Sequence, residues 1–215
     1  MMQRCFICLL LLLTISGCAH RGSFTPPPDL VAHQQQLQRI TDWELTGKLG
    51  IRTPDESGSA SLKWAQQLAD YQINLSGPLG QKRMIITGTP GKVRLEQTGS
   101  EVLEARSAEA LIKKAAGWTL PVAQLTYWVR GVPAPKQRIT HLQQNESGLI
   151  AQLQQGGWSI AYSNYKNYTF SAHNGSTSPT AQTFTLPGKV TAEHEDVRLI
   201  LVIRDWQLGN QAPTK

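Results

Sequence analysis

Alternating polarity in short segments constrains the fold of this 215-residue chain more than any other feature of its sequence. Over residues 43–51 the apolar side chains fall on odd positions and the polar ones mostly on even positions, which is the period of a strand with one buried face. Connections between such segments are short and rich in Gly, Asn, Ser and Pro, which favours antiparallel neighbours. We therefore predict a large, strongly curved antiparallel sheet. Similar runs recur at residues 61–64, 71–75, 84–87, 92–96, 102–105, 139–143, 149–153, 158–162, 184–186 and 198–206.

Helices are expected at three places. Near the start of the folded region, Asp29 can cap a short amphipathic helix. Midway through the strands, Ser107 can cap a helix that ends at Gly117. A second helix follows directly, with Pro121 at its first position and Gly131 at its end. Two helices inserted there can pack over the open side of a curved sheet as a lid or plug. The apolar stripe of the second one consists of Val122, Leu125, Trp128 and Val129.

The N-terminal segment has the composition of an export signal, because Arg4 supplies a positive charge and residues 6–15 form an almost unbroken apolar run. The run has about half of the ~20 residues that a membrane-spanning helix needs, and no second run of that length follows it. It ends in Ile-Ser-Gly-Cys18, which resembles the lipobox of bacterial lipoproteins. The resemblance implies a diacylglycerol group on Cys18, removal of residues 1–17 and, because Ala19 is not Asp, sorting to the outer membrane. An ordinary signal peptide that happens to contain a cysteine is the alternative.

Removal of that segment would leave a single cysteine. Cys5 and Cys8 look like a redox or metal pair but lie within the segment, so the mature chain would keep only Cys18. Without disulfides, a cysteine nucleophile or a cysteine metal site, the fold must be held by its core. Residues 18–28 contain a proline run that would extend the chain as a tether. We expect residues 29–215 to form a single β-rich domain.

The charge balance is mildly basic, with a formal net charge of +6 and a pI near 9.4. The basic side chains are scattered rather than clustered, so we do not expect binding to nucleic acid. Such an excess could suit an anionic membrane surface or an acidic partner protein, but an ordinary solvated surface is the preferred explanation.

Sequence motifs of enzymes are missing. Lys92 and Lys189 each follow a glycine, but a valine comes next and the upstream glycine of a phosphate-binding loop is absent. No Gly-x-Ser-x-Gly motif occurs. The histidines lack the spacing of a metal site, and the His-Glu-Asp cluster at residues 194–196 is typical of a solvated turn. We therefore expect no enzymatic activity, no cofactor and no metal, although paired carboxylates could still meet in the folded chain.

The most unusual turn is Gly-Pro-Leu-Gly at residues 77–80. Proline at the second position and glycine at the fourth favour a type I turn, which leaves Leu79 at the tip. An exposed leucine there invites a protein partner, a membrane, or a contact folded back onto its own domain. The turn residues alone leave these alternatives open.

Taken together, these features resemble the LolB family, the outer-membrane lipoprotein receptors that take lipoproteins from the periplasmic carrier LolA. The resemblance covers essentially the whole mature domain and rests on the order and spacing of fragments that are weakly specific one by one. They are the lipobox with its tether, Trp43 with Gly47, residues 77–80, 89–95, 117–125 and 128–133, Tyr162 with Tyr165, and residues 202–206.

The resemblance implies an unclosed (half) β-barrel whose open side is covered by helices and whose interior is an apolar cavity for acyl chains. It implies that the leucine at the position of Leu79 protrudes and promotes membrane insertion. It also implies a monomer, lipid-anchored in the outer membrane and facing the periplasm. The expected partners are LolA with its lipoprotein cargo, acyl chains and outer-membrane phospholipid. Because the sequence contains no nucleotide site, transfer would run down an affinity gradient without ATP.

Candidate cavity residues follow from strand period and residue type. Each of them is explained equally well as ordinary core. They are Trp43, Leu45, Leu49, Leu62, Trp64, Ile73, Leu75, Trp118, Leu125, Trp128, Trp158, Ile160 and Tyr162.

The stretch of residues 162–181 departs from the regular pattern. It is long and polar, with several asparagines, and it predicts a mobile loop. The sequence indicates no role for it.

Three classes of function make different demands on the chain. A lipid-anchor receptor needs an apolar cavity and an exposed Leu79. A hydrolase acting on lipid or cell wall needs convergent titratable groups, and the missing catalytic motifs weigh against it. A structural envelope protein needs neither feature, and the apolar turn tip weighs against that class.

Overall fold

The computed structural model describes residues 29–77, 83–172 and 180–209. Its helices are α2 (Leu30–Gln38), α3 (Ala108–Ala116) and α4 (Val122–Trp128). Its strands are β1 (Asp42–Arg52), β2 (Ser57–Gln67), β3 (Asp70–Ser76), β4 (Met84–Thr89), β5 (Lys92–Gln97), β6 (Leu103–Ala105), β7 (Ile139–Gln144), β8 (Ile150–Gln155), β9 (Trp158–Ser163), β10 (Lys166–Ala172), β11 (Thr180–Leu186), β12 (Lys189–His194) and β13 (Val197–Leu208).

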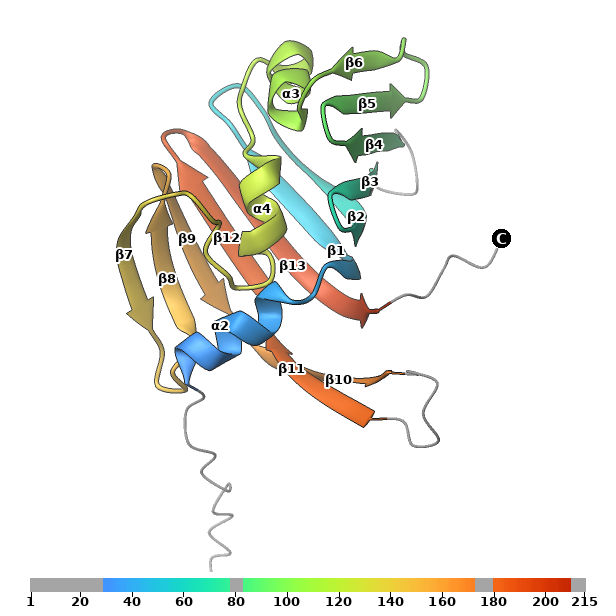
Figure 1. Cartoon of the computed structure of the whole chain (residues 1–215). Coiled ribbons are helices and arrows are strands. Elements are labelled where there is room, and N and C mark those ends of the chain that lie inside the picture. Colours follow the sequence, from blue (N-terminus) through green and yellow to red (C-terminus); the bar gives the residue numbers. More distant parts are fainter. Residues whose placement is uncertain (1–28, 78–82, 173–179, 210–215) are drawn as a thin grey trace, which may run out of the picture.

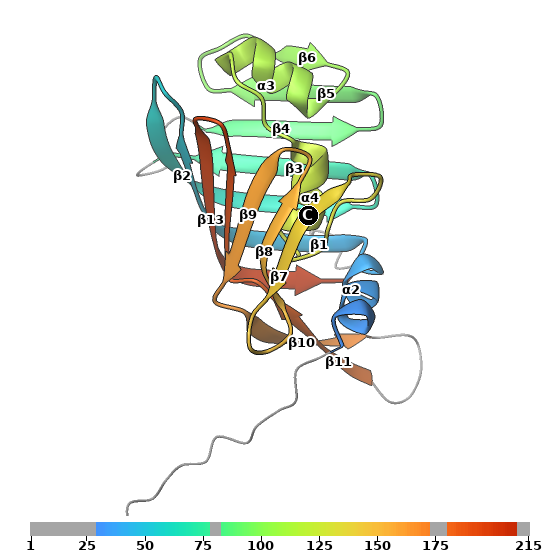
Figure 2. The ribbon, with the colours of Figure 1, turned by 90° about the vertical axis from the view of Figure 1, so that its left-hand side faces the viewer.

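One antiparallel sheet of 11 strands forms the body of the molecule, in the order β6-β5-β4-β3-β2-β1-β13-β12-β9-β8-β7. The sheet does not close into a barrel, because its two edge strands, β6 and β7, do not pair with each other. Its curvature is strong, and Figure 2 shows β7, β8 and β9 running nearly across β3, β4 and β5. The prediction of a large, curved and unclosed antiparallel sheet is confirmed.

The central strand β1 has the predicted alternation, with Trp43, Leu45 and Gly47 buried on one face. It pairs with β2 on one side and β13 on the other. The register against β13 shifts between Thr46 and Gly47. A Cβ atom on Gly47 would collide with the carbonyl oxygen of Val202, so only glycine allows the two backbones to approach this closely.

Two of the three helices begin where their caps predict, and α4 begins at Val122, one position after the Pro121 that was expected to start it. The Asp29 carboxylate accepts a hydrogen bond from Val31 N at the start of α2, and the Ser107 hydroxyl accepts one from Ala110 N at the start of α3. Gly117, with φ of 81°, ends α3 in the left-handed conformation. Figure 1 shows α3 and α4 on the concave side of the sheet and α2 beside the lower end of α4.

The core behind α4 combines aromatic rings with one buried amide. Gln155 is 1% exposed. Its Oε1 accepts hydrogen bonds from Trp128 Nε1 (2.9 Å) and Ala134 N (2.8 Å). Its Nε2 donates to Ala134 O (3.0 Å) and Gln137 O (3.1 Å). All of its hydrogen-bonding capacity is used, so this amide joins α4, the segment after it and β8 into one unit.

Two strands were not predicted. The prediction of a loop over residues 162–181 is wrong for most of the residues that the structure describes there. Residues 166–172 form β10, which pairs with β11 as a separate two-stranded sheet. Tyr168 and Phe170 alternate with polar residues on β10, and Phe170 lies near Phe184 with the ring centroids 6.2 Å apart. Strand β12 was not predicted either. His194 is its last residue, and Glu195 and Asp196 form the expected turn between it and β13.

Candidate functional site

An apolar cavity lies between the concave face of the sheet and the helices α3 and α4. Its volume is about 60 Å³. The only polar side-chain atom among the residues that line it belongs to the indole of Trp64. The lining residues are Leu49, Leu62, Trp64, Ile73, Leu75, Ile86, Ile112, Leu120, Val122, Leu125, Val129, Val190, Ala192, Leu199 and Leu201.

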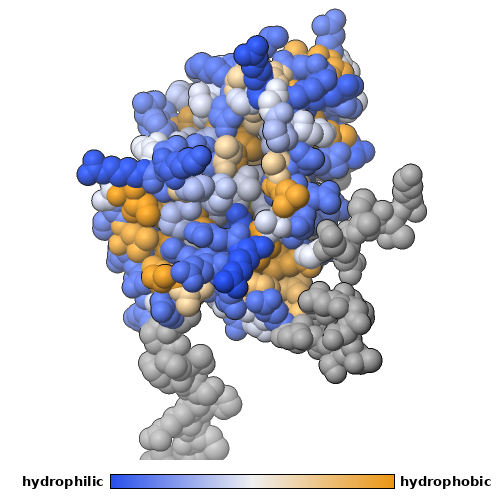
Figure 3. Space-filling model, in the orientation of Figure 1, coloured by the Kyte–Doolittle hydropathy of each residue, from blue (hydrophilic) through white to orange (hydrophobic). Residues whose placement is uncertain are grey.

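The cavity is small because helical side chains occupy the concave side of the sheet. Ile112 comes from α3, Leu120 from the linker after it, and Leu125 from α4. Binding sites for small molecules usually measure roughly 300–1,000 Å³, so the cavity as it stands is a gap between packed layers. Figure 3 shows hydrophilic residues over most of the face turned to the viewer, with apolar residues in separate patches.

A larger, open depression, which we call the vestibule, adjoins one end of the cavity. Its volume is about 930 Å³, and it is lined by Thr53, Pro54, Asp55, Glu56, Lys113, Ala115, Gly117, Trp118, Thr119, Trp158, His194, Glu195, Asp196 and Val197. The two hollows have no lining residue in common, but their linings are neighbours along the chain. Lys113 follows Ile112, Thr119 precedes Leu120, and Val197 lies two positions before Leu199. An extended ligand that protruded from the cavity at this end would therefore emerge into the vestibule.

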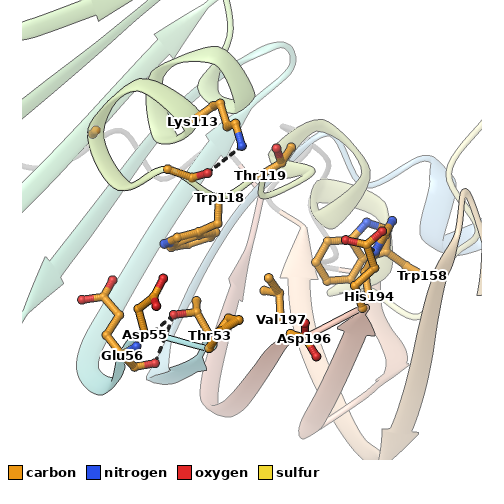
Figure 4. A pocket seen from close by; sticks show the side chains of 14 residues that line it. Thr53, Asp55, Glu56, Lys113, Trp118, Thr119, Trp158, His194, Asp196 and Val197 are labelled. Carbon is orange, nitrogen blue, oxygen red and sulfur yellow. Dashed lines mark hydrogen bonds and ion pairs between the residues drawn. The ribbon is translucent and has the colours of Figure 1, made fainter.

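The vestibule is polar and predominantly acidic. Asp55, Glu56, Glu195 and Asp196 are exposed on its rim. Lys113 Nζ donates to the carbonyl oxygen of Gly117 at 2.6 Å, and Figure 4 shows this contact above the ring of Trp118. Four carboxylates thus face one lysine and one histidine, although the whole chain carries a formal charge of +6.

Arg130 ties the C-terminal end of α4 to α2. The side chain is 4% exposed. Its Nη1 donates to Leu37 O (2.9 Å) and Ile40 O (2.6 Å), and its Nε donates to Thr126 O (3.1 Å). Its guanidinium carbon lies 5.4 Å from the ring centroid of Tyr127. Burial lowers the pKa of Arg130 to about 10, which leaves the group charged at neutral pH. The carbonyl groups at the end of α2 are the negative end of the helix dipole, so they suit this cation.

The residues proposed from the sequence for the cavity fall into three groups. Leu49, Leu62, Trp64, Ile73, Leu75 and Leu125 line it. Trp118 and Trp158 line the vestibule. Trp43, Leu45, Trp128, Ile160 and Tyr162 are buried in the surrounding core.

Several lining residues were missed by the sequence analysis. Val190 and Ala192 belong to the unpredicted strand β12. Ile86 follows the inward period of β4, and Val122 and Val129 belong to the apolar stripe predicted for α4. The period of the strand and the stripe of the helix were thus the available signals.

Two of the proposed functional residues, Cys18 and Leu79, lie outside the described residues. Within residues 29–77, 83–172 and 180–209, no helix is long and apolar enough to cross a membrane. In that same part of the chain, no group of three or more His, Cys, Asp or Glu side chains is placed to hold a metal ion.

Comparison with known proteins assigns a family to this architecture. Residues 41–206, which extend from the residue before β1 to two residues before the end of β13, match the model of the family of outer membrane lipoprotein LolB. The chain belongs to the LolB family. It is 60% identical over 206 residues to the outer-membrane lipoprotein LolB of Cellvibrio japonicus (strain Ueda107), covering 94% of this chain and 97% of that protein. It is 40% identical to LolB of Stutzerimonas stutzeri (strain A1501), covering 93% of this chain and 92% of that protein.

Among solved structures, a LolA superfamily protein from Nitrosomonas europaea aligns with a TM-score of 0.48 and 7% identity, covering 86% of this chain and 96% of that one. A putative outer membrane lipoprotein-sorting protein domain from Vibrio parahaemolyticus aligns with a TM-score of 0.48 and 8% identity, covering 86% and 92%.

Proposed function

We propose that this chain is an outer-membrane lipoprotein receptor. It accepts lipoproteins from the periplasmic carrier LolA, holds their acyl chains between the sheet and the helices α3 and α4, and inserts them into the outer membrane. It acts as a monomer, is anchored by a lipid on Cys18 and faces the periplasm. The observation that carries the proposal is the apolar cavity lined by Leu62, Leu125 and their neighbours.

The energetics of the cargo explain why such a cavity is required. Moving one acyl chain from an apolar environment into water costs on the order of 10 kcal/mol, at ~0.8 kcal/mol per methylene. A triacylated lipoprotein therefore cannot cross water unaided and must be shielded at each step. Transfer without ATP then requires that affinity for the acyl chains increases from carrier to receptor to bilayer.

The cavity must enlarge to hold an acyl chain, because its present volume of about 60 Å³ is far below that of a usual ligand site. The apolar side chains on α3 and α4 that fill the concave side are the obstacle. Outward movement of α3, the linker after it and the N-terminal half of α4 would join their apolar faces to those of the sheet as the walls of one groove. We propose that chains enter and leave through the vestibule.

The tether limits how far the domain can travel from its membrane. Residues 18–28 reach at most about 40 Å at ~3.3–3.6 Å per residue. A receptor on such a tether stays close enough to the bilayer for an exposed leucine to touch it. This is the role that we propose for Leu79.

The test is the transfer of a radiolabelled triacylated lipoprotein from its LolA complex into outer-membrane vesicles. The wild-type mature protein is compared with Leu79→Glu. The matched control is Leu68→Glu, since Leu68 lies in the β2–β3 turn and is 70% exposed. Substitution there introduces the same charge at an exposed leucine of a different turn.

We expect the wild type and Leu68→Glu to accept and deliver the lipoprotein. We expect Leu79→Glu to accept the cargo but to deliver it at least ten times more slowly. An equal decrease in the delivery rate of Leu79→Glu and Leu68→Glu would mean that a negative charge near the membrane, rather than the loss of Leu79, impairs transfer. If the wild type neither accepts nor delivers cargo, the proposed function is wrong.

A further inference from the structure

Trp118 lies where the polar vestibule meets the apolar cavity. It is one of the residues that line the vestibule, and Leu120, two positions later, lines the cavity. The residue belongs to the linker between α3 and α4. Figure 4 shows its ring lying below the end of α3, on the side of the vestibule formed by Thr53, Asp55 and Glu56.

The indole N–H of Trp118 is buried and has no hydrogen-bond acceptor within the part of the chain that the structure describes. Trp128 behaves differently, since its Nε1 donates to Gln155 Oε1 at 2.9 Å. A buried donor without an acceptor loses its hydration and gains nothing in return, so most proteins avoid it. An indole can only donate, and the missing partner must therefore be an acceptor.

The chemistry of the ligand supplies an acceptor at this place. This step rests on the proposed function. Acyl chains that lie in the cavity begin at a carbonyl group, in an ester or an amide, and the polar end of each chain must emerge toward the vestibule. Ionised carboxylates of Asp55 and Glu56 cannot donate to a carbonyl, and Lys113 already donates to Gly117 O.

We propose that Trp118 Nε1 donates a hydrogen bond to the carbonyl oxygen at the head of a bound acyl chain. The site then recognises an acyl ester or amide and not hydrocarbon alone. The ring also covers the boundary, with its apolar face toward the chain and its N–H toward the carbonyl, which is the usual place of tryptophan between an apolar and a polar region. Because the acyl chains lie in the cavity and their carbonyl groups lie at Trp118, the depth at which the lipid binds is fixed.

The test compares two synthetic lipids of equal chain length on the same cysteinyl peptide. In one lipid the two glycerol-linked chains are esters, and in the other they are ethers without carbonyls. Each lipid displaces a fluorescent fatty acid from the mature chain, which carries Cys18→Ala so that no anchor of its own competes. The variants are Trp118→Phe and the matched control Trp206→Phe. The indole N–H of Trp206 is also buried without an acceptor among the described residues, but Trp206 lies in the core, 2% exposed, and lines neither the cavity nor the vestibule.

We expect the wild type and Trp206→Phe to bind the ester about 2- to 10-fold more tightly than the ether, as a neutral hydrogen bond allows. We expect this preference to vanish in Trp118→Phe, with affinity for the ether unchanged. An unchanged ester preference in Trp118→Phe overturns the inference, and so does an equal loss of the preference in Trp206→Phe, because the preference would then not depend on the indole N–H of Trp118. If neither lipid displaces the probe from any variant, the proposed function itself fails.

A second measurement does not depend on the folding of a variant. In the wild-type protein labelled with ¹⁵N, the indole proton of Trp118 should shift downfield with the ester lipid and not with the ether lipid. Identical shifts with both lipids would show that the ring senses the chains and not the carbonyl, and would overturn the inference.

Discussion

The two ends of α4 are held to the rest of the molecule in different ways. At the C-terminal end, Trp128 donates to the buried Gln155, and Arg130 donates to two carbonyl oxygens of the α2 region. At the N-terminal end, the one side-chain hydrogen bond to another element described in the structure runs from Ala123 N to the exposed carboxylate of Glu109 on α3. Between the two ends of α4, the side chain of Leu125 lines the cavity.

This difference indicates which part of the structure can open. Bonds in a buried network cost much free energy to break, because the separated groups lose both their partners and water. A single exposed bond competes with water and costs little. A cavity of about 60 Å³ can thus enlarge by movement of α3 and the N-terminal half of α4, with the end at Trp128 and Arg130 as the fixed point.

The largest effect that tests the fixed end is expected for Arg130→Met. The substitution removes the buried donor from Ile40 O and one of the two donors from Leu37 O, so the free energy of unfolding should fall by about 2–5 kcal/mol. Urea unfolding followed by tryptophan fluorescence measures it. Arg138→Met, at an exposed position, is the control and should change stability by less than about 0.5 kcal/mol. A loss as small in Arg130→Met as in the control would mean that this end of α4 is no better held than the other.

Much of this arrangement could be predicted from the sequence. The caps Asp29 and Ser107 placed two helices correctly, and the alternation of residues 43–51 placed β1. These signals are local, since a cap or a period of two is complete within a few residues. Strand β10 was missed because polar residues separate Tyr168 from Phe170, and the polar composition outweighed the period.

The division between cavity and core could not be predicted, for a different reason. Leu45 and Leu49 have the same residue type and the same inward position on β1, yet only Leu49 lines the cavity. What separates them is the distance of the helices from each point of the sheet, which depends on long-range packing. Arg130 was missed as a link between helices because its acceptors there are the backbone carbonyls of residues 93 and 90 positions earlier, and backbone carbonyls carry no sequence signal.

A smaller effect should appear in native-state hydrogen exchange along α4. Val129 N and Gly131 N, which donate to Leu125 O and Trp128 O, should exchange at least about ten times more slowly than Ala123 N, a difference of ~1.4 kcal/mol in opening free energy. Glu109→Ala should speed exchange at Ala123 and leave Val129 unchanged. Uniform protection along the helix would contradict a loose end, and entry of acyl chains would then need movement of another element.

The smallest effect concerns His33, which extends the fixed region from Arg130 along α2. His33 Nε2 lies 2.9 Å from Thr185 O on β11. Burial lowers the pKa of His33, and the bond to the Thr185 carbonyl offsets this only in part. Below its usual pKa of 6.5, the unfolded chain therefore binds a proton more readily than the folded one. The free energy of unfolding should fall as the pH drops from 6.5 toward the folded pKa, and this group should contribute no further change below that value.

Urea midpoints measured across this pH range test the prediction. His33→Gln should remove this part of the pH dependence, whereas His141→Gln, at an exposed position on β7, should retain it. The same pH dependence in His33→Gln and in the wild type would mean that α2 does not bury this imidazole against β11. In that case the fixed region would end at the contacts of Arg130 with Leu37 O and Ile40 O, and the N-terminal part of α2 would not belong to it.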